Sequence, residues 1–131
     1  MMRVWEDVYM RLELDATQRI VRQTRTSRVY EDIETFSASL QALVAHMQSV
    51  DRAQWVLLQD MRAARGRNDP QFEAAVKRSR PALSGGFRKV AVLVATQVGR
   101  LQVQRFLEES GTLSRAFLDE REALDWLKSR S

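Results

Sequence analysis

Three arginines in one short segment are the residues of this sequence best suited to bind a ligand. Arg62, Arg65 and Arg67 lie in "RAARGRNDP", whose final Asp-Pro pair is typical of a helix start. A guanidinium binds carboxylates and phosphates through paired, coplanar hydrogen bonds. Asp60 and Asp69 flank the segment and could pair with two of the arginines instead. The segment is therefore either an anion site or a solvated, locally paired loop.

The position of this segment bears on the choice. In open α/β sheets, ligands collect outside the carboxyl ends of the parallel strands, where helix amino ends also favour anions. The apolar run 55–59 precedes the arginines, and a second run, 90–95, precedes Thr96 and Arg100. If the two strands are neighbours, all five residues converge on a phosphate-bearing metabolite or an acidic partner segment.

Catalytic chemistry has few candidates. The chain of 131 residues has no cysteine and one histidine, His46, which lies off the apolar stripe of a helix with no carboxylate at helical spacing, so we expect a solvated surface histidine. No clustered side chains suggest a metal site, and no phosphate-loop motif is present. We expect no catalytic residue, no metal and no cofactor, and hence a protein that is not an enzyme.

The hydrophobic pattern predicts the elements that position these residues. Alternation predicts a strand at 4–14 with Val8 and Met10 on its buried face, and a second strand at 18–27 completes a hairpin. Helices are expected from about residue 31, from Pro70 to Pro81, over 97–110 and after Asp119, which forms a capping box with Glu122. Buried strands are expected at 55–59 and 90–95, and a short strand at 114–117.

The resulting order, ββαβαβαβα, predicts a single α/β domain over residues 1–131. Its sheet is mixed but mostly parallel, with about five strands, four main helices and an antiparallel opening edge. The inner face of the second helix carries Phe72, Ala75, Val76 and Ser79. That of the third helix carries Gly99, Val103, Phe106, Leu107 and Ser110, and the core near the chain's end includes Phe117, Ala123, Leu124, Trp126 and Leu127.

Two apolar residues, Val98 and Leu101, fall outside the inner face of the third helix. They form either a self-association patch, which would make the protein a homodimer, or a surface covered by a neighbouring loop.

The segments "FRKVAVLVAT" and "AFLDEREALDWL", taken with the order of elements, resemble the STAS-like (SpoIIAA-like) domains of bacteria. The likeness covers nearly the whole chain and rests on core and cap residues. It implies a single mixed sheet wound with helices. It also implies a regulatory or binding module that acts through a protein partner or a small anionic ligand.

The best-known relatives, the anti-sigma-factor antagonists, switch partners when a serine is phosphorylated at the start of the helix after the strand at 55–59. Here the residues from Gln54 to Arg78 include no Ser, Thr or Tyr. We therefore expect no phosphoserine switch in this segment.

An alternative function is binding of nucleic acid, because the formal net charge is +4 and most of the positive charge is arginine. Arg19, Arg22, Arg25 and Arg28 alternate between the two faces of a strand and form no single stripe, which disfavours this function. The sequence shows no signal peptide and no membrane-spanning run, so we expect a cytoplasmic protein without a membrane partner.

Overall fold

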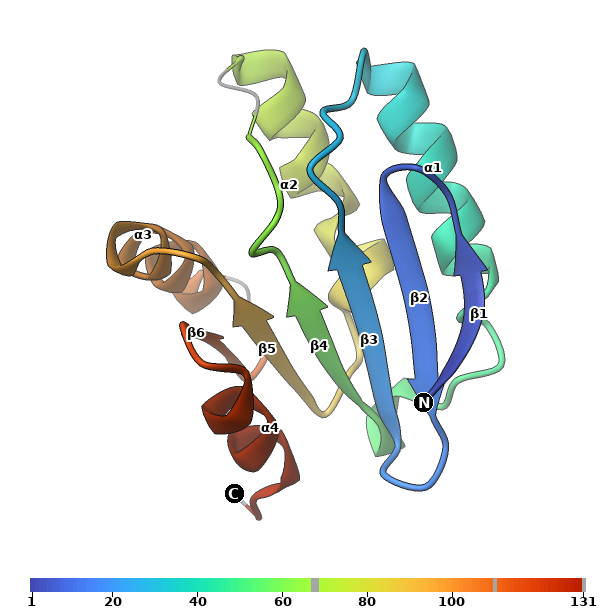
Figure 1. Ribbon diagram of the computed structural model, residues 1–131, viewed down its shortest axis with the longest axis vertical. Helices are drawn as coiled ribbons and strands as arrows, with labels where there is room; N and C mark the ends of the chain where they lie inside the picture. The colour runs from blue at the N-terminus through green and yellow to red at the C-terminus, as the bar shows by residue number, and fades with distance from the viewer. Residues whose placement is uncertain (67–68, 110, 131) are drawn as a thin grey trace.

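A single sheet organises the residues described by the computed structural model, namely 1–66, 69–109 and 111–130. This sheet has six strands and carries four helices (Figure 1), which confirms the predicted α/β class. The strands are β1 (Met2–Glu6), β2 (Met10–Asp15), β3 (Ile20–Arg25), β4 (Val56–Asp60), β5 (Lys89–Leu93) and β6 (Ser114–Phe117). The helices are α1 (Ile33–Ala45), α2 (Pro70–Ser84), α3 (Gln97–Glu108) and α4 (Glu120–Lys128).

The strands lie in the sheet in the order of the sequence, from β1 to β6. The pairs β1–β2 and β2–β3 are antiparallel, and the pairs from β3 to β6 are parallel. Right-handed crossovers between strands that advance in one direction place every connecting helix on the same face. Accordingly α1, α2 and α3 cover one face, and α4, which follows the last strand, packs on the other (Figure 1).

The opening strand predicted at 4–14 is in fact two strands, so the sheet has six rather than about five. Asp7 divides it, because its Oδ1 accepts hydrogen bonds from the backbone N–H groups of Tyr9 and Met10, both at 2.8 Å. This side-chain turn reverses the chain and makes β1 the antiparallel edge. Val8 lies in the turn and is exposed, so the prediction that it shares the buried face with Met10 is wrong.

The prediction that Pro81 ends α2 is also wrong, because the helix continues to Ser84. Pro81 lies in the last turn, and its carbonyl accepts a hydrogen bond from the N–H of Gly85 at 2.9 Å. The guanidinium of Arg52 donates to the carbonyls of Ala82 and Gly85, both at 2.8 Å, and so satisfies the end of the helix. A Cβ at Gly85 would lie 2.5 Å from the Pro81 oxygen, so only glycine fits here.

At the start of α4, the capping box predicted from Asp119 and Glu122 does not form. Asp119 has the extended backbone of an N-cap residue, but its side chain makes no capping hydrogen bond. Instead, Glu120 in the first turn of α4 accepts hydrogen bonds from Arg22 and Arg62 at 2.7 and 3.0 Å, which attach the start of this helix to β3 and to the segment after β4.

Two apolar clusters lie between the sheet and its helices, one on each face. The cluster under α4 contains Ile20, Val56, Leu58, Ala91, Leu93, Phe117, Ala123 and Leu127. Phe117 is buried as predicted, whereas Trp126 is only partly buried and packs against the cluster, its ring 5.6 Å from that of Phe117. None of the described helices is both long and apolar enough to cross a membrane.

Candidate functional site: a cavity between the sheet and two helices

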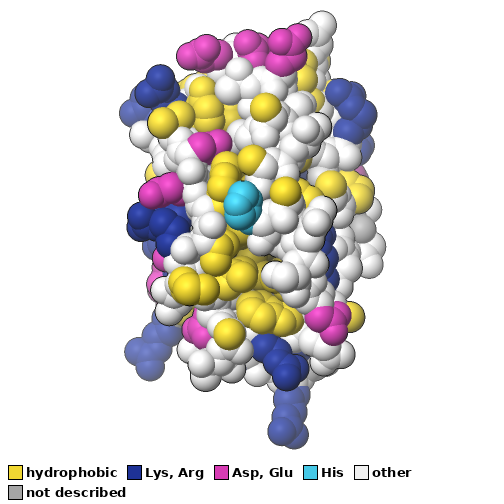
Figure 2. All heavy atoms as spheres, turned by 90° about the vertical axis from the view of Figure 1, so that its right-hand side faces the viewer, with side chains coloured by type: hydrophobic (Ala, Val, Ile, Leu, Met, Phe, Trp, Pro, Cys, Tyr) yellow, Lys and Arg dark blue, Asp and Glu magenta, His cyan; other side chains and the backbone are white. Residues whose placement is uncertain are grey.

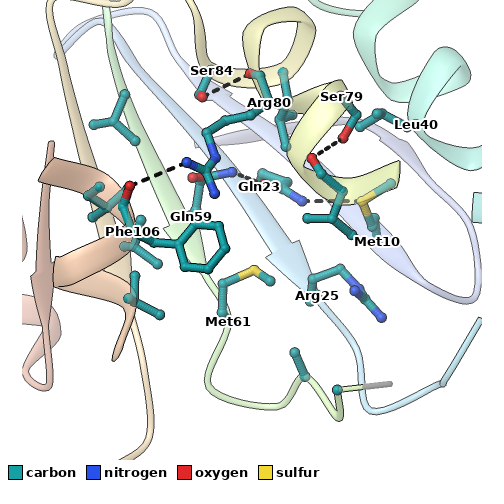
Figure 3. A pocket seen from close by; sticks show the side chains of 18 of the residues that line it. Met10, Gln23, Arg25, Leu40, Gln59, Met61, Ser79, Arg80, Ser84 and Phe106 are labelled. Atoms are coloured by element: carbon teal, nitrogen blue, oxygen red, sulfur yellow. Dashed lines mark hydrogen bonds between the residues drawn. The ribbon is translucent and has the colours of Figure 1, made fainter. Parts of the chain in front are cut away.

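A cavity of about 440 Å³ lies between the sheet and the helices α2 and α3 (Figure 3). Its size is within the range of small-molecule sites. Most of its surface is apolar, and the apolar lining includes Met10, Phe36, Leu40, Met61, Phe72, Leu83, Val90, Val92, Val103 and Leu107.

The cavity explains why two residues of the predicted inner faces are exposed. Val76 of α2 and Phe106 of α3 are 38% and 47% exposed, and both line the cavity. The two helices thus turn the expected faces inward, where Phe72, Ala75 and Leu107 pack in the core and the rest of each face borders the cavity. Ser110, predicted on the same face of α3, lies outside the described residues.

Three side chains form a hydrogen-bonded relay on the floor of the cavity (Figure 3). Gln23 Nε2 donates to the sulfur of Met10 at 3.2 Å, and Gln59 Nε2 donates to Gln23 Oε1 at 2.9 Å. Gln23 and Gln59 are direct neighbours on the paired strands β3 and β4. Gln23 is 2% exposed, so its amide depends on these two partners.

Arg25 is the buried cation of the cavity wall. It is 9% exposed, its guanidinium lies 4.6 Å from the ring centre of Tyr30, and it donates to the carbonyls of Tyr9 and Arg28 at 3.2 and 3.1 Å. Among the described residues no carboxylate lies within ion-pair distance of it. Burial lowers the pKa of Arg25 from its usual value, because the charged form is poorly solvated there. Asp7 acts on this charge from beyond ion-pair distance, and two carbonyls and the Tyr30 ring contact the guanidinium directly.

Two further arginines line the cavity. Arg80 of α2 stacks its guanidinium over the Phe106 ring at 4.7 Å and donates to the Phe106 carbonyl at 3.4 Å (Figure 3). Arg65 is exposed and makes no hydrogen bond or ion pair with any described residue. Glu73 is the one carboxylate among the described lining residues. The cavity thus has an excess of positive charge.

Arg62, from the segment first considered as an anion site, is committed elsewhere. Its guanidinium binds both carboxylate oxygens of Asp60 at 3.0 and 2.8 Å and also reaches Glu120, while Arg22 bridges the same two acids. The hydrogen bond to Asp60 raises the pKa of Arg62. Burial alone would raise the pKa of Asp60, but hydrogen bonds from Arg62 and Arg22 lower it to about 2. Local pairing, one of the two interpretations of this segment, thus holds for Arg62.

Two other members of the predicted anion site, Thr96 and Arg100, have hydrogen-bond partners on α3 itself. Thr96 caps α3 by accepting from the N–H of Gly99 at 3.0 Å, and Arg100 donates to Gln97 at 3.1 Å. β4 and β5 are neighbours, as that site requires. Arg67 lies outside the described residues. No hydrogen bond or ion pair joins the described members of the set, Arg62, Arg65, Thr96 and Arg100, and an anion role at this edge stays a prediction.

Two other candidates sit on the surface. Val98 and Leu101 are 66% and 54% exposed, so they lie outside the core face of α3 as predicted, and self-association through them stays a prediction. His46 lies at the surface near β1 (Figure 2), where its Nδ1 donates to the carbonyl of Ala42 at 2.7 Å and its ring is 6.1 Å from Trp5. It is the exposed histidine that its position on the helix predicts.

Of the polar residues that line the cavity, the sequence predicted Arg65 as an anion contact but did not predict a role for Gln23, Arg25, Gln59 or Arg80. A signal existed, because Gln23 and Gln59 occupy inward-facing positions of strands whose other inward residues are mostly apolar. Arg25 lies two residues beyond Gln23 on the same face. A polar side chain at such a position needs either a buried hydrogen-bond partner or a cavity that a polar group can enter. Gln23 has buried partners, and Gln59 has one partner and also lines the cavity.

The sheet order and the helix placement together define a SpoIIAA-like fold. The chain is similar to an uncharacterised protein of the DUF3478 family with a SpoIIAA-like fold from Shewanella loihica PV-4. The two chains are 16% identical, and the match has a TM-score of 0.66 and covers 95% of this chain and 98% of the other. This confirms the sequence resemblance at the level of the fold. No protein-family model and no curated protein matches the sequence.

Proposed function

We propose that this protein is a non-enzymatic binding module of STAS-like type, which holds a small amphipathic anion in the cavity. Arg25 is the observation that carries the proposal. Two carbonyls and the Tyr30 ring contact this buried charge, but no carboxylate forms an ion pair with it, and a bound anion would reduce the cost of burying it. The apolar walls then accommodate the rest of the ligand. In this proposal ligand binding takes the regulatory place that phosphorylation has in the anti-sigma-factor antagonists.

The ligand's anionic group is a carboxylate or a phosphate, since both match a guanidinium. Arg80 and Arg65 add to the attraction at the cavity, and Glu73 offsets part of it. The described cavity residues offer no paired acid and base, and we propose binding without chemical conversion. We place this activity in the cytoplasm, with a protein partner that responds to the bound state.

The nucleic-acid alternative gains no support from the arrangement of basic side chains. Arg22 and Arg62 pair with acids, while Arg52, Arg88 and Lys89 donate to carbonyls at helix ends. These cationic side chains already have partners within the protein and are therefore poorly placed to contact phosphates. Binding that falls steeply with salt would nevertheless restore the alternative.

Calorimetric titration with ten-carbon amphiphiles tests the proposal. We expect decanoate and decyl phosphate to bind saturably and raise the melting temperature, decanol to bind more weakly, and decyltrimethylammonium not to bind. Arg25→Met should abolish the preference for anions, whereas Arg28→Met, an exposed control three residues away, should keep it. The proposal is wrong if no amphiphile binds the wild type, or if folded Arg25→Met binds decanoate as the wild type does.

A further inference from the structure

The relay on the cavity floor has a defined direction. A thioether sulfur accepts hydrogen bonds but has no proton to donate. Gln23 must therefore turn its Nε2 toward Met10 and its Oε1 toward Gln59. Gln59 in turn must present its Nε2 to Gln23. The sulfur of Met10 thus sets the orientation of both amides, which chemistry alone would leave free to flip.

This direction leaves one acceptor without a partner. Gln59 Oε1 has no hydrogen bond to any described residue. Among the described residues, the side-chain atoms that are both fully buried and without a hydrogen bond are Arg11 Nε and Thr24 Oγ1, so Gln59 Oε1 is not fully buried. It is therefore accessible, and Gln59 lines the cavity. An acceptor in an apolar site favours a ligand group that can donate to it, and disfavours one that only desolvates it.

We propose that Gln59 Oε1 accepts a hydrogen bond from a hydroxyl or N–H group of the ligand. The ligand would then be an amphipathic anion with one internal hydrogen-bond donor. This proposal rests on the proposed function, because it places a second contact inside the same cavity. Gln23 and Arg25 are two residues apart on β3, and Gln59 lies beside Gln23 on β4. These spacings separate the donor from the anionic group by roughly 8 Å.

The wild-type protein tests this without any substitution. Decanoate is compared by calorimetry with hydroxydecanoates whose hydroxyl sits at successive carbons along the chain. We expect one mid-chain isomer to bind about tenfold more tightly than decanoate, which corresponds to one good neutral hydrogen bond. Equal or weaker binding by every isomer overturns this inference and leaves the proposed function intact. Failure of all the acids to bind overturns both.

A matched pair of variants assigns the effect to the relay. In Gln59→Leu the order should reverse, with decanoate tighter than the preferred isomer, because the hydroxyl then loses water without gaining a partner. Gln54→Leu, an exposed glutamine five residues earlier, should keep the wild-type order. Met10→Leu removes the group that orients the amides and should reduce the preference to within about twofold. A hydroxyl preference that persists in folded Gln59→Leu contradicts the assignment.

Discussion

The two faces of the sheet bury their side chains in different ways. On the face under α4, called the filled face here, the apolar residues pack together, and the charged groups Asp60 and Lys89 have hydrogen-bond partners within the chain. Lys89 is fully buried there, and its ammonium donates to the carbonyls of Trp126 and Ser129 and to the Ser129 hydroxyl at 2.7 to 2.8 Å. On the face under α1, α2 and α3, called the cavity face, a hollow remains, and Arg25 and Gln59 keep unused hydrogen-bonding capacity.

This difference separates stability from binding. A chain selected for stability alone gains by filling a hollow and neutralising a buried charge, as the filled face does. The cavity face has neither feature, because an unfilled cavity and the buried Arg25 lie side by side there. Such a local departure, a hollow beside a buried cation that has no ion pair, is typical of a functional site.

The largest contrast between the faces is expected from truncation of leucines. Leu58→Ala on the filled face should lower the free energy of unfolding by about 4 kcal/mol, because the side chain is fully buried and leaves a void. Leu83→Ala borders the existing cavity and should cost about 1–2 kcal/mol. Urea denaturation measures both, and equal losses would contradict a distinction between the faces.

The buried lysine gives the next effect. Lys89→Met keeps the length of the side chain but removes the ammonium donor to the Ser129 carbonyl and hydroxyl and one of the donors to the Trp126 carbonyl, at a cost of about 3 kcal/mol. Lys128→Met in the exposed last turn of the same helix should change the unfolding free energy by less than about 0.5 kcal/mol. A neutral Lys89→Met would show that the filled face does not depend on this polar anchor.

The ion pairs beside α4 predict a smaller, pH-dependent effect. The folded pKa of Asp60, about 2, lies below its unfolded value, so its contribution is complete above about pH 4 and is lost as the pH falls toward 2. The wild type should lose about 2 kcal/mol of unfolding free energy through this group over that interval. Asp60→Asn should lack this component, and Asp51→Asn, an exposed control, should retain it. Parallel profiles for wild type and Asp60→Asn would rule out the role of the pair.

The elements that local rules predict well are those whose signals lie close together in the sequence. Asp69 caps α2 by accepting from the N–H of Phe72 at 2.8 Å, as the Asp-Pro pair indicates. The end of α2 follows a different logic, because Arg52, which satisfies its carbonyls, lies 30 residues upstream of Ala82. Pro81 looks like a terminator only when that distant side chain is unknown.

The candidate site was predictable in its chemistry but not in its location. The sequence predicts that arginines bind a small anionic ligand, and arginines also line the cavity in which we propose that such a ligand binds. The structure assigns the anion contact to Arg25, which has no ion pair with any described acid, instead of Arg62, which pairs with Asp60. Periodicity assigns Val76 and Phe106 to inner faces but cannot show whether those faces meet side chains or a hollow. That outcome depends on the distance between elements, which emerges only from the whole fold.

The smallest and sharpest comparison adds one methylene to each face. Val56 on β4 and Val92 on β5 are both buried, but Val56 belongs to the filled face and Val92 lines the cavity. Val56→Ile should cost about 1 kcal/mol, because a packed core yields only by moving its neighbours. Val92→Ile should be neutral or stabilise by up to about 0.8 kcal/mol, since its methyl group enters empty space. The same change should weaken binding of decanoate by occupying that space. Thermal unfolding and calorimetry on this pair of variants therefore test whether filling the cavity raises stability at the expense of ligand binding. A destabilised Val92→Ile with unchanged binding of decanoate would show that it does not.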